Sequence, residues 1–327
     1  MRRACSGLAA LILVFVPFAQ GAPAPIRPVI NVANANSVEK AGEVPYDCWQ
    51  MVLGPQEGQV SLIAWEAAID VYDDYTSKCL RHIVQNRKLV HMAYSPDGTR
   101  LAYCENSTKA GLLDLRSGKL IEISAGGYQP DLAFSPDGKL LATGGTKAML
   151  WDATTGVRLR TFDSDLAGAL TVRFSPNGKT LAIGNRNSTT RLFDTTSGRL
   201  LHVLKKQSSQ ELKFSPDGKL LAVAYVDGSV ALWNAADGTL ARSKKTSGSE
   251  LYSLDWSPAG DVLVTSGSES KITLWNPADL SILKELESPP WVIQVRFNHD
   301  GTRLFTAGGS LMKSPDRKVT VWAPTRR

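Results

Sequence analysis

A four-residue turn that recurs about every 40 residues constrains this chain more than any other feature. Ser-Pro-Asp-Gly occupies residues 95–98, 135–138 and 215–218, and Ser-Pro-Asn-Gly occupies residues 175–178. Two weaker copies follow at 257–260 and 298–301, so that successive copies start 40, 40, 40, 42 and 41 residues apart. A regular period of this length predicts an array of one supersecondary unit, which overrides the two domains that 327 residues would suggest.

The turn itself is of the hairpin kind. Pro presets the backbone of the second turn position, Asp or Asn suits the third, and Gly adopts the left-handed conformation that a side chain would resist. An apolar-x-aromatic triplet precedes each turn, as in residues 172–174, and a short apolar run follows it, as in residues 220–223. Each copy therefore predicts two antiparallel strands joined by a tight turn.

A third and a fourth strand complete each repeat. The third strand ends in an aromatic residue followed by Asp or Asn, as in Trp151-Asp152, and a second turn leads into a fourth strand such as Arg158 to Phe162. In Val230 to Trp233 both alternating faces are apolar, so this sheet has to be covered on both sides. Radially stacked blades provide that cover, because each sheet then lies between two neighbours.

These repeats resemble the WD-repeat family of β-propellers over residues 49 to 323. The resemblance lies in the turns and in the pairs that end the third strands, which are Tyr72-Asp73, Leu113-Asp114, Trp151-Asp152, Phe193-Asp194, Trp233-Asn234, Trp275-Asn276 and Trp322-Ala323. It implies an all-β fold, a seven-bladed β-propeller of four-stranded antiparallel blades. The family's Gly-His dipeptide is missing from every repeat, so we expect apolar packing in place of the family's buried Asp-His-Ser/Thr-Trp hydrogen-bond network.

The first and last blades are the least regular. The first is predicted to have strands at Trp49 to Leu53 and Val60 to Trp65, with a turn between them. The last has no fourth strand after its third, whose open edge would expose unpaired backbone groups, so a strand from the N-terminal segment is expected to close the ring. Residues 29–33 have the higher β-propensity and are favoured, whereas the spacing of the repeats points to about residues 37–42.

The first 21 residues have the layout of a secretory signal peptide. Arg2 and Arg3 precede an apolar run from Leu8 to Phe18, which is too short for a transmembrane helix of about 20 residues, and small residues follow it. We expect a signal peptide at 1–21, an N-terminal segment with the ring-closing strand at 22–48, and the propeller at 49–327. The expected protein is exported, periplasmic or secreted, of a bacterial type, and not inserted in the membrane after cleavage.

Composition and charge exclude several functional classes. Hydrophobic residues make up 43% of the chain, which predicts a folded protein. Without Arg2 and Arg3 the net charge falls from +6 to +4, an excess too small and too dispersed to indicate a nucleic-acid partner. Four cysteines without a Cys-x-x-Cys pair indicate neither a metal site nor another cofactor. Only Cys48 and Cys104 have strand positions that would allow a disulfide, and free thiols are the favoured alternative.

No catalytic residue is expected in this chain. His82, His91, His202 and His299 fall at different places in the repeats and fit strand surfaces or turns, and no nucleophile elbow is present. The alternative is a propeller enzyme that acts on a small molecule in the central channel, in the manner of lactonase-like or dehydrogenase-like propellers or a channel-type hydrolase.

Four charged residues are expected to line the central channel, because each lies in the middle of the triplet of an innermost strand. They are Arg173, Lys213, Asp255 and Arg296. Two interpretations stay open. The four side chains form either an ion network centred on Asp255 that leaves positive potential, or internal pairs that fix the register of the blades.

The resemblance to WD-repeat proteins implies a non-catalytic scaffold that presents loops on a rigid ring to a protein partner. The face opposite the uniform Ser-Pro-Asp-Gly turns carries the connections that vary between repeats, which favours recognition there. Basic, aromatic and flexible apolar residues gather on it over blades four to seven, as at protein interfaces. The candidate partner-binding residues are Arg186, Lys205, Lys206, Lys244, Lys245, Trp291, Leu311, Met312, Lys313 and Arg317.

The partner implied by these residues is another protein with an acidic patch, bound by a monomer. The alternative is that the lysines are solvated and that Trp291 packs under its own loop.

Overall fold

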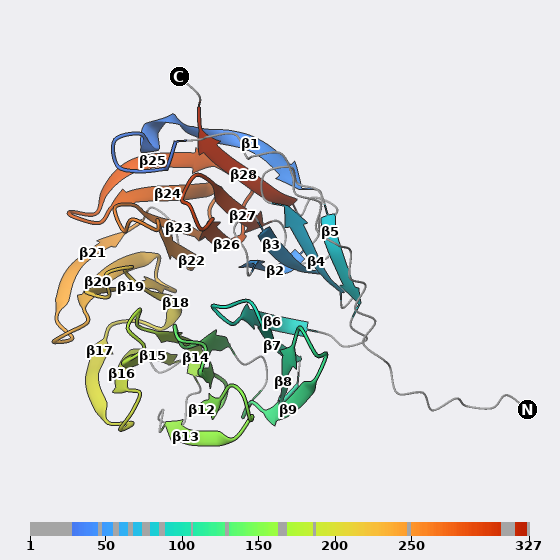
Figure 1. The fold of residues 1–327 in the computed structure, drawn as a ribbon. Helices are drawn as coiled ribbons and strands as arrows, with labels where there is room; N and C mark the ends of the chain where they lie inside the picture. Colours follow the sequence, from blue (N-terminus) through green and yellow to red (C-terminus); the bar gives the residue numbers. More distant parts are fainter. Residues whose placement is uncertain are drawn as a thin grey trace, which may run out of the picture.

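The computed structural model contains seven four-stranded antiparallel sheets arranged around a central axis (Figure 1). It describes residues 28–44, 48–54, 59–64, 68–73, 79–84, 89–105, 107–127, 131–162, 169–185, 188–246, 250–308 and 318–325. The predicted all-β, seven-bladed propeller is confirmed. The expected signal peptide lies outside the described residues. Within the part of the chain that the structure describes, no helix has the length and apolar character of a membrane span.

Each blade runs from an innermost strand beside the axis to an outermost strand at the rim. Blade 1 consists of β2 (Cys48–Leu53), β3 (Gln59–Ala64), β4 (Ala68–Asp73) and β5 (Cys79–Val84); blade 2 of β6 (Leu89–Tyr94), β7 (Arg100–Glu105), β8 (Lys109–Asp114) and β9 (Leu120–Ser124); blade 3 of β10 (Leu132–Phe134), β11 (Leu140–Thr143), β12 (Ala148–Asp152) and β13 (Arg158–Phe162). Blade 4 consists of β14 (Ala169–Phe174), β15 (Thr180–Asn185), β16 (Thr189–Asp194) and β17 (Leu200–Lys205); blade 5 of β18 (Ser209–Phe214), β19 (Leu220–Tyr225), β20 (Ser229–Asn234) and β21 (Leu240–Lys245); blade 6 of β22 (Leu251–Trp256), β23 (Leu263–Gly267), β24 (Lys271–Asn276) and β25 (Ser281–Glu287).

Blade 7 combines strands from both ends of the chain. It contains β26 (Val292–Phe297), β27 (Leu304–Gly308), β28 (Lys318–Pro324) and, at the rim, β1 (Val38–Val44). The innermost strands touch one another in order around the axis, and β2 touches β26. The contact between β2 and β26 closes the ring at the axis, and β1 completes blade 7 at the rim (Figure 1).

The strand that closes the ring does not lie at residues 29–33, which the sequence analysis favoured. Residues 29–33 form no strand, and β1 pairs antiparallel with β28 from Val38 opposite Pro324 to Val44 opposite Val319. In the rejected stretch, the side chain of Asn31 accepts a hydrogen bond from the Ala33 nitrogen at 2.9 Å, and the 3-10 helix Ala35–Ser37 follows. Such Asn-centred turns compete with strand pairing, so the β-propensity of neighbouring valines was the weaker signal. The spacing of the repeats was the better guide.

The repeated turns explain how neighbouring blades pack together on the face that carries the Ser-Pro-Asp-Gly turns. In the first copy, the Gly98 nitrogen donates to the Ser95 carbonyl at 2.8 Å, the Ser95 hydroxyl donates to Asp97 at 2.6 Å, and Gly98 has φ +67°. From blade 3 to blade 7, each turn glycine faces the proline of the preceding blade's turn, so that a Cβ on Gly138 would lie 3.5 Å from Pro96. The turns thus pack blade against blade as well as joining two strands.

Apolar residues fill the spaces between the blades, and β20 in blade 5 is buried over five of its six residues. The expectation that apolar packing replaces the whole family network is only partly right. Trp151, Trp275 and Trp322 each donate the indole N–H to a threonine hydroxyl of the neighbouring strand at 2.8 to 3.0 Å. Trp233 donates instead to the Tyr225 hydroxyl at 3.0 Å. The Trp-to-Thr part of the network is therefore present without any histidine.

Candidate functional site

A column of polar side chains stands at the same position in, or directly before, every innermost strand, two residues before the middle of the triplet. Its members are Gln50, His91, Asp131, Thr171, Glu211, Ser253 and Gln294. In six blades the register shifts just before this residue, as between Cys48 and Gln50. Residues two apart on a strand share a face, so the column lies on the side that carries the predicted channel residues.

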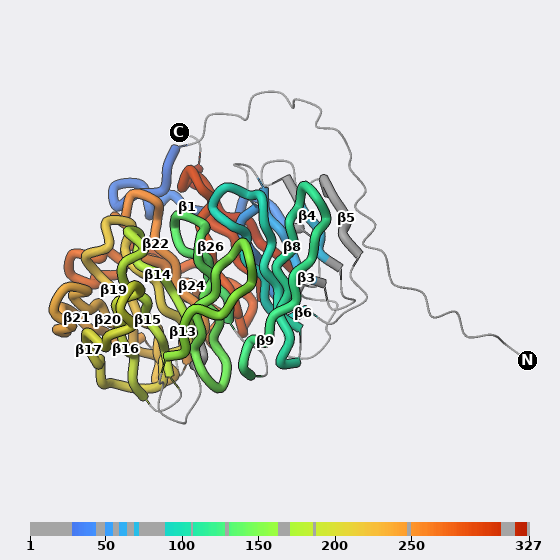
Figure 2. Tube along the Cα trace, turned by 60° about the horizontal axis from the view of Figure 1, so that its bottom comes forward, coloured from blue at the N-terminus to red at the C-terminus, as the bar shows by residue number. Residues whose placement is uncertain are grey.

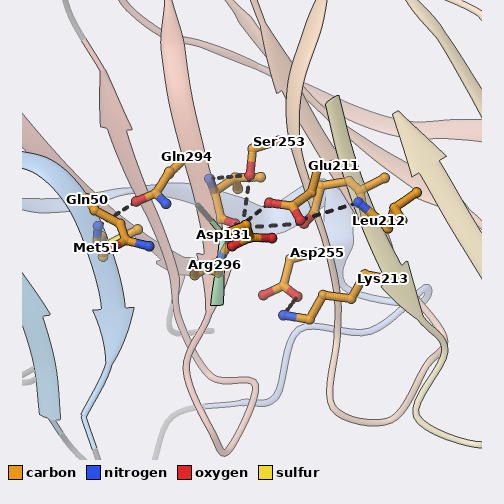
Figure 3. A network of polar contacts seen from close by, with 12 residues as sticks. Gln50, Met51, Asp131, Glu211, Leu212, Lys213, Ser253, Asp255, Gln294 and Arg296 are labelled. Carbon is orange, nitrogen blue, oxygen red and sulfur yellow. Dashed lines mark hydrogen bonds and ion pairs between the residues drawn. The ribbon is translucent and has the colours of Figure 1, made fainter. Parts of the chain in front are cut away.

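Several members of this column bind the next blade through its backbone. Gln50 accepts from the Met92 nitrogen at 2.6 Å, Asp131 from the Val172 nitrogen at 3.0 Å, and Ser253 from the Val295 nitrogen at 3.3 Å. Gln294 of blade 7 accepts from the Met51 nitrogen of blade 1, which repeats the pattern across the junction of the ring (Figure 3). The column is therefore a set of contacts between successive blades.

Glu211 is the centre of the ion network at the axis. Its two carboxylate oxygens accept from Arg173 of blade 4 at 2.6 Å and from Arg296 of blade 7 at 3.1 Å. Arg173 also forms an ion pair with Asp131 of blade 3. The chain of contacts Asp131, Arg173, Glu211 and Arg296 thus links blades 3, 4, 5 and 7. Glu211 and Arg296, which Figure 3 labels, join two blades that are not neighbours.

Asp255 is not the centre of an ion network, which was one of the two interpretations that the sequence left open. Of the expected channel residues only Lys213 pairs with it, at 2.6 Å, and the carboxylate also accepts from the backbone nitrogens of Trp256 at 3.0 Å and Phe297 at 2.9 Å. The structure therefore brings Lys213 and Asp255 together, and it brings Arg173 and Arg296 together through Glu211, which the sequence analysis missed.

The charges of this axial network balance, so these six groups leave no positive excess. The cations Arg173, Lys213 and Arg296 meet the anions Asp131, Glu211 and Asp255. Burial alone would raise the pKa of Asp131, but attraction to Arg173 and the hydrogen bond from Val172 hold it below its usual value. Burial would lower the pKa of Arg173, and the carboxylates of Asp131 and Glu211 raise it instead. Both groups are charged at neutral pH.

His91 lies in the same column and is not the plain surface histidine that we expected. Its Nδ1 lies 3.3 Å from the Gln50 side-chain nitrogen. Burial lowers the pKa of His91, which favours the neutral ring as an acceptor for Gln50. Among the described residues no cluster of His, Cys, Asp and Glu could hold a metal ion. Cys104 is buried and has no disulfide, so the bridge to Cys48 is not formed.

The structure separates the predicted partner-binding residues into two groups. Arg186, Leu311, Met312, Lys313 and Arg317 lie outside the described residues. The second group lies at the ends of two outer strands. Lys205 ends β17 and Lys206 follows it, and β21 ends with Lys244 and Lys245. Figures 1 and 2 show these two strands next to each other at the rim.

Two of these lysines contact the neighbouring blade. The Lys206 ammonium donates to the Ser243 hydroxyl and lies 4.9 Å from the Tyr225 ring centroid. Burial lowers the pKa of Lys206. Lys244 donates to the Leu280 carbonyl at 3.1 Å and lies 5.8 Å from the Trp275 ring centroid. Lys205 and Lys245 are exposed.

Trp291 packs against a residue of blade 6 and does not stand free. Its ring is stacked on Tyr252 with the centroids 5.9 Å apart, and its backbone has φ +64°. The Tyr252 hydroxyl donates to Glu250 at 2.6 Å, and burial together with this carboxylate raises the pKa of Tyr252. Trp291 therefore joins the variable faces of blades 6 and 7.

A basic surface without ion pairs to other described residues lies beside these residues. We call β13, β17 and β21 the basic wall, because these outer strands contain Arg158, Arg160, Lys205, Arg242, Lys244 and Lys245 and no Asp or Glu. Three of the four other outer strands contain acids, namely β1, β9 and β25, and ion pairs join Glu285 of β25 to Lys271 and Glu43 of β1 to Lys318. Aligning the fourth strands of the repeats would have revealed the difference.

Comparison with known proteins places these features in context. A family model described as "WD domain, G-beta repeat" matches residues 130–152, and one described as "Eukaryotic translation initiation factor eIF2A" matches residues 154–277. Apoptotic protease-activating factor 1 of Homo sapiens is 31% identical over 98 residues, which are 27% of this chain and 8% of that protein. THO complex subunit 3 of Arabidopsis thaliana is 22% identical over 163 residues, 49% of this chain and 50% of that protein.

The chain thus spans half or less of the length of these relatives. The repeated turns, the seven four-stranded blades and the WD-domain match together support a WD-repeat β-propeller.

Proposed function

We propose that this protein is a non-catalytic scaffold that binds another protein in an extracytoplasmic compartment. WD-repeat propellers generally bind other proteins, and one similar protein is named as a subunit of a complex. The closed ring supports this role, because a scaffold has to hold its binding surface rigid. Export rests on the signal-like segment at residues 1–21.

The observation that carries the proposal is the contrast between the channel and the rim. At the axis, three cations and three anions bind one another and adjacent backbone groups. Side chains committed in this way hold the blades together and do not need a substrate as a partner. At the rim, Lys205, Arg242 and Lys245 are exposed and form no ion pair among the described residues. This contrast favours an outer binding surface over the alternative of a channel enzyme.

The proposed partner carries an acidic patch, since the exposed excess charge on blades 3 to 5 is basic. Complementary charge would speed encounter and orient the partner, and binding would weaken as salt rises. The proposed state of the free protein is a monomer.

Affinity capture tests the proposal. The full chain with a C-terminal tag is produced in a cell that exports it, and complexes are captured from the exported fraction after chemical crosslinking. We expect the processed chain to be crosslinked to a partner in a fixed ratio, and purified components to reassemble. A tagged propeller from an unrelated exported protein is the control. A chain that keeps residues 1–21 and stays in the cytoplasm contradicts export, and failure to reassemble with any captured protein contradicts the scaffold role.

A further inference from the structure

The outermost strand of blade 5 departs from the repeat at the position that anchors the other outer strands. Its equivalents in blades 2, 3, 4 and 6 are large apolar residues that are 1 to 6% exposed: Ile123, Phe162, Leu204 and Leu286. Each lies opposite the first or second residue of the third strand, as Leu204 lies opposite Thr190. In blade 5 the residue opposite Val230 is Lys244. The apolar anchor is replaced by a charge.

The consequence for β21 is exposure along its whole length. Five of its six residues are exposed and none is buried, whereas β9, β13, β17 and β25 each contain a buried residue. Within the described residues β21 pairs only with β20, so its other edge has no partner strand. Leu240 at its start is 49% exposed. This strand offers an open row of backbone groups beside basic and apolar side chains.

Protection against aggregation does not explain this combination. Lysines on an edge strand do discourage pairing with other chains. A lysine at any exposed position would serve that purpose, however, and loss of the anchor weakens the blade without adding to it. An acidic residue would serve as well, yet β13, β17 and β21 contain none. The basic wall is therefore better explained as a surface that selects the charge of what binds there.

We propose that β21 docks an extended acidic segment of a partner protein, which adds to its open edge as a fifth strand of blade 5. This inference rests on the proposed scaffold function and specifies its binding surface. Backbone pairing supplies affinity, as in other cases of strand addition, and alternate side chains supply specificity. Carboxylates of alternate residues in the segment face Arg242 and Lys244, Lys245 adds positive charge on the opposite face of β21, and an apolar residue covers Leu240. The site lies at the rim, apart from the loops of the variable face.

A labelled peptide tests the docking directly. The probe is a fluorescein-labelled peptide of alternating Glu and Val, and its binding to the mature chain is followed by fluorescence anisotropy. We expect saturable binding that weakens with salt, and a loss of about tenfold or more in affinity for the Arg242→Glu, Lys245→Glu double variant. The matched control is Arg116→Glu, Lys119→Glu, which makes the same change of net charge in the turn before β9 and should leave binding unchanged.

Two further probes separate strand addition from attraction of charge alone. The same peptide with alternate backbone nitrogens methylated keeps its carboxylates but cannot pair along an edge, so its binding should be lost. Equal binding of the methylated peptide, or equal loss in both double variants, would overturn the proposal. Preferential binding to vesicles that contain phosphatidylserine or to heparin, with no binding of the peptide, would also overturn it.

Binding of the partner protein itself distinguishes a wrong β21 site from a wrong scaffold function. If a reconstituted partner binds the wild-type chain and the Arg242→Glu, Lys245→Glu variant equally, the scaffold function holds and the β21 site is wrong. If no partner binds the wild-type chain, the scaffold function is wrong as well.

Discussion

Charged side chains gather in two regions of this propeller, around the axis and along the outer strands of blades 3 to 5, and their surroundings are opposite. At the axis, Glu211 is one-tenth exposed and binds two arginines from different blades. At the rim, Arg242 and Lys245 are exposed. A buried ion pair is sensitive to the loss of either partner, whereas an exposed charge contributes little to folding. The first region therefore stabilises the ring, and the second is the one proposed to bind a partner.

The largest effect is expected from removing the centre of the axial network. Glu211→Ala leaves Arg173 and Arg296 partly buried without their shared carboxylate, so the free energy of unfolding should fall by about 3–5 kcal/mol. Urea unfolding followed by tryptophan fluorescence measures it. The matched control is Glu285→Ala, which removes an exposed partner of Lys271 and should cost less than about 1 kcal/mol. Equal losses in the two variants would show that the axial charges are not a special set.

A smaller effect is expected from acid, through His91. Because burial lowers the folded-state pKa of His91, the unfolded chain takes up a proton near its ordinary pKa of about 6.5 while the folded chain does not. This contribution to stability is complete above pH of about 6.5 and is lost as the pH falls toward the lower folded pKa. We expect the free energy of unfolding to decrease between about pH 7 and 5, by at most about 1.4 kcal/mol per pH unit from this one group.

His91→Gln tests the assignment, since glutamine keeps a hydrogen-bonding side chain beside Gln50 but does not titrate. The pH slope should flatten over that range in this variant and persist in His299→Gln, where the histidine is exposed in a turn. An unchanged slope in His91→Gln would assign the acid sensitivity to another group. Asp131 contributes only at lower pH, because its folded pKa lies below its usual value.

The sequence predicted the frame of the molecule better than its contacts. Local turn chemistry that recurs at a fixed period specified seven blades, and such signals can be read from the sequence of each repeat alone. The axial column was also readable, because all seven residues two before the middle of the triplet are polar. Which of them pair was not readable, since Glu211 reaches Arg296 two blades away and that contact depends on the curvature of the ring. The ring-closing strand was misassigned because the turn-forming Asn31 competes with the β-propensity of its neighbours.

The smallest stability effect is expected at the rim, and it has the opposite sign. Lys244→Leu restores the apolar anchor of the other blades, and the gain from burying leucine should exceed the loss of the hydrogen bond to Leu280, a net rise of about 1 kcal/mol in the free energy of unfolding. Lys245→Leu removes an equal charge at the adjacent residue without restoring the anchor. Its free energy of unfolding should stay within about 0.5 kcal/mol of wild type. A rise in the first variant together with weaker peptide binding would mean that the lysine is kept at a cost in stability, as recognition surfaces often are. If Lys244→Leu instead destabilises the protein, its contacts with Leu280 and Trp275 are structural, and the rim resembles the axis more than the comparison of the two regions implies.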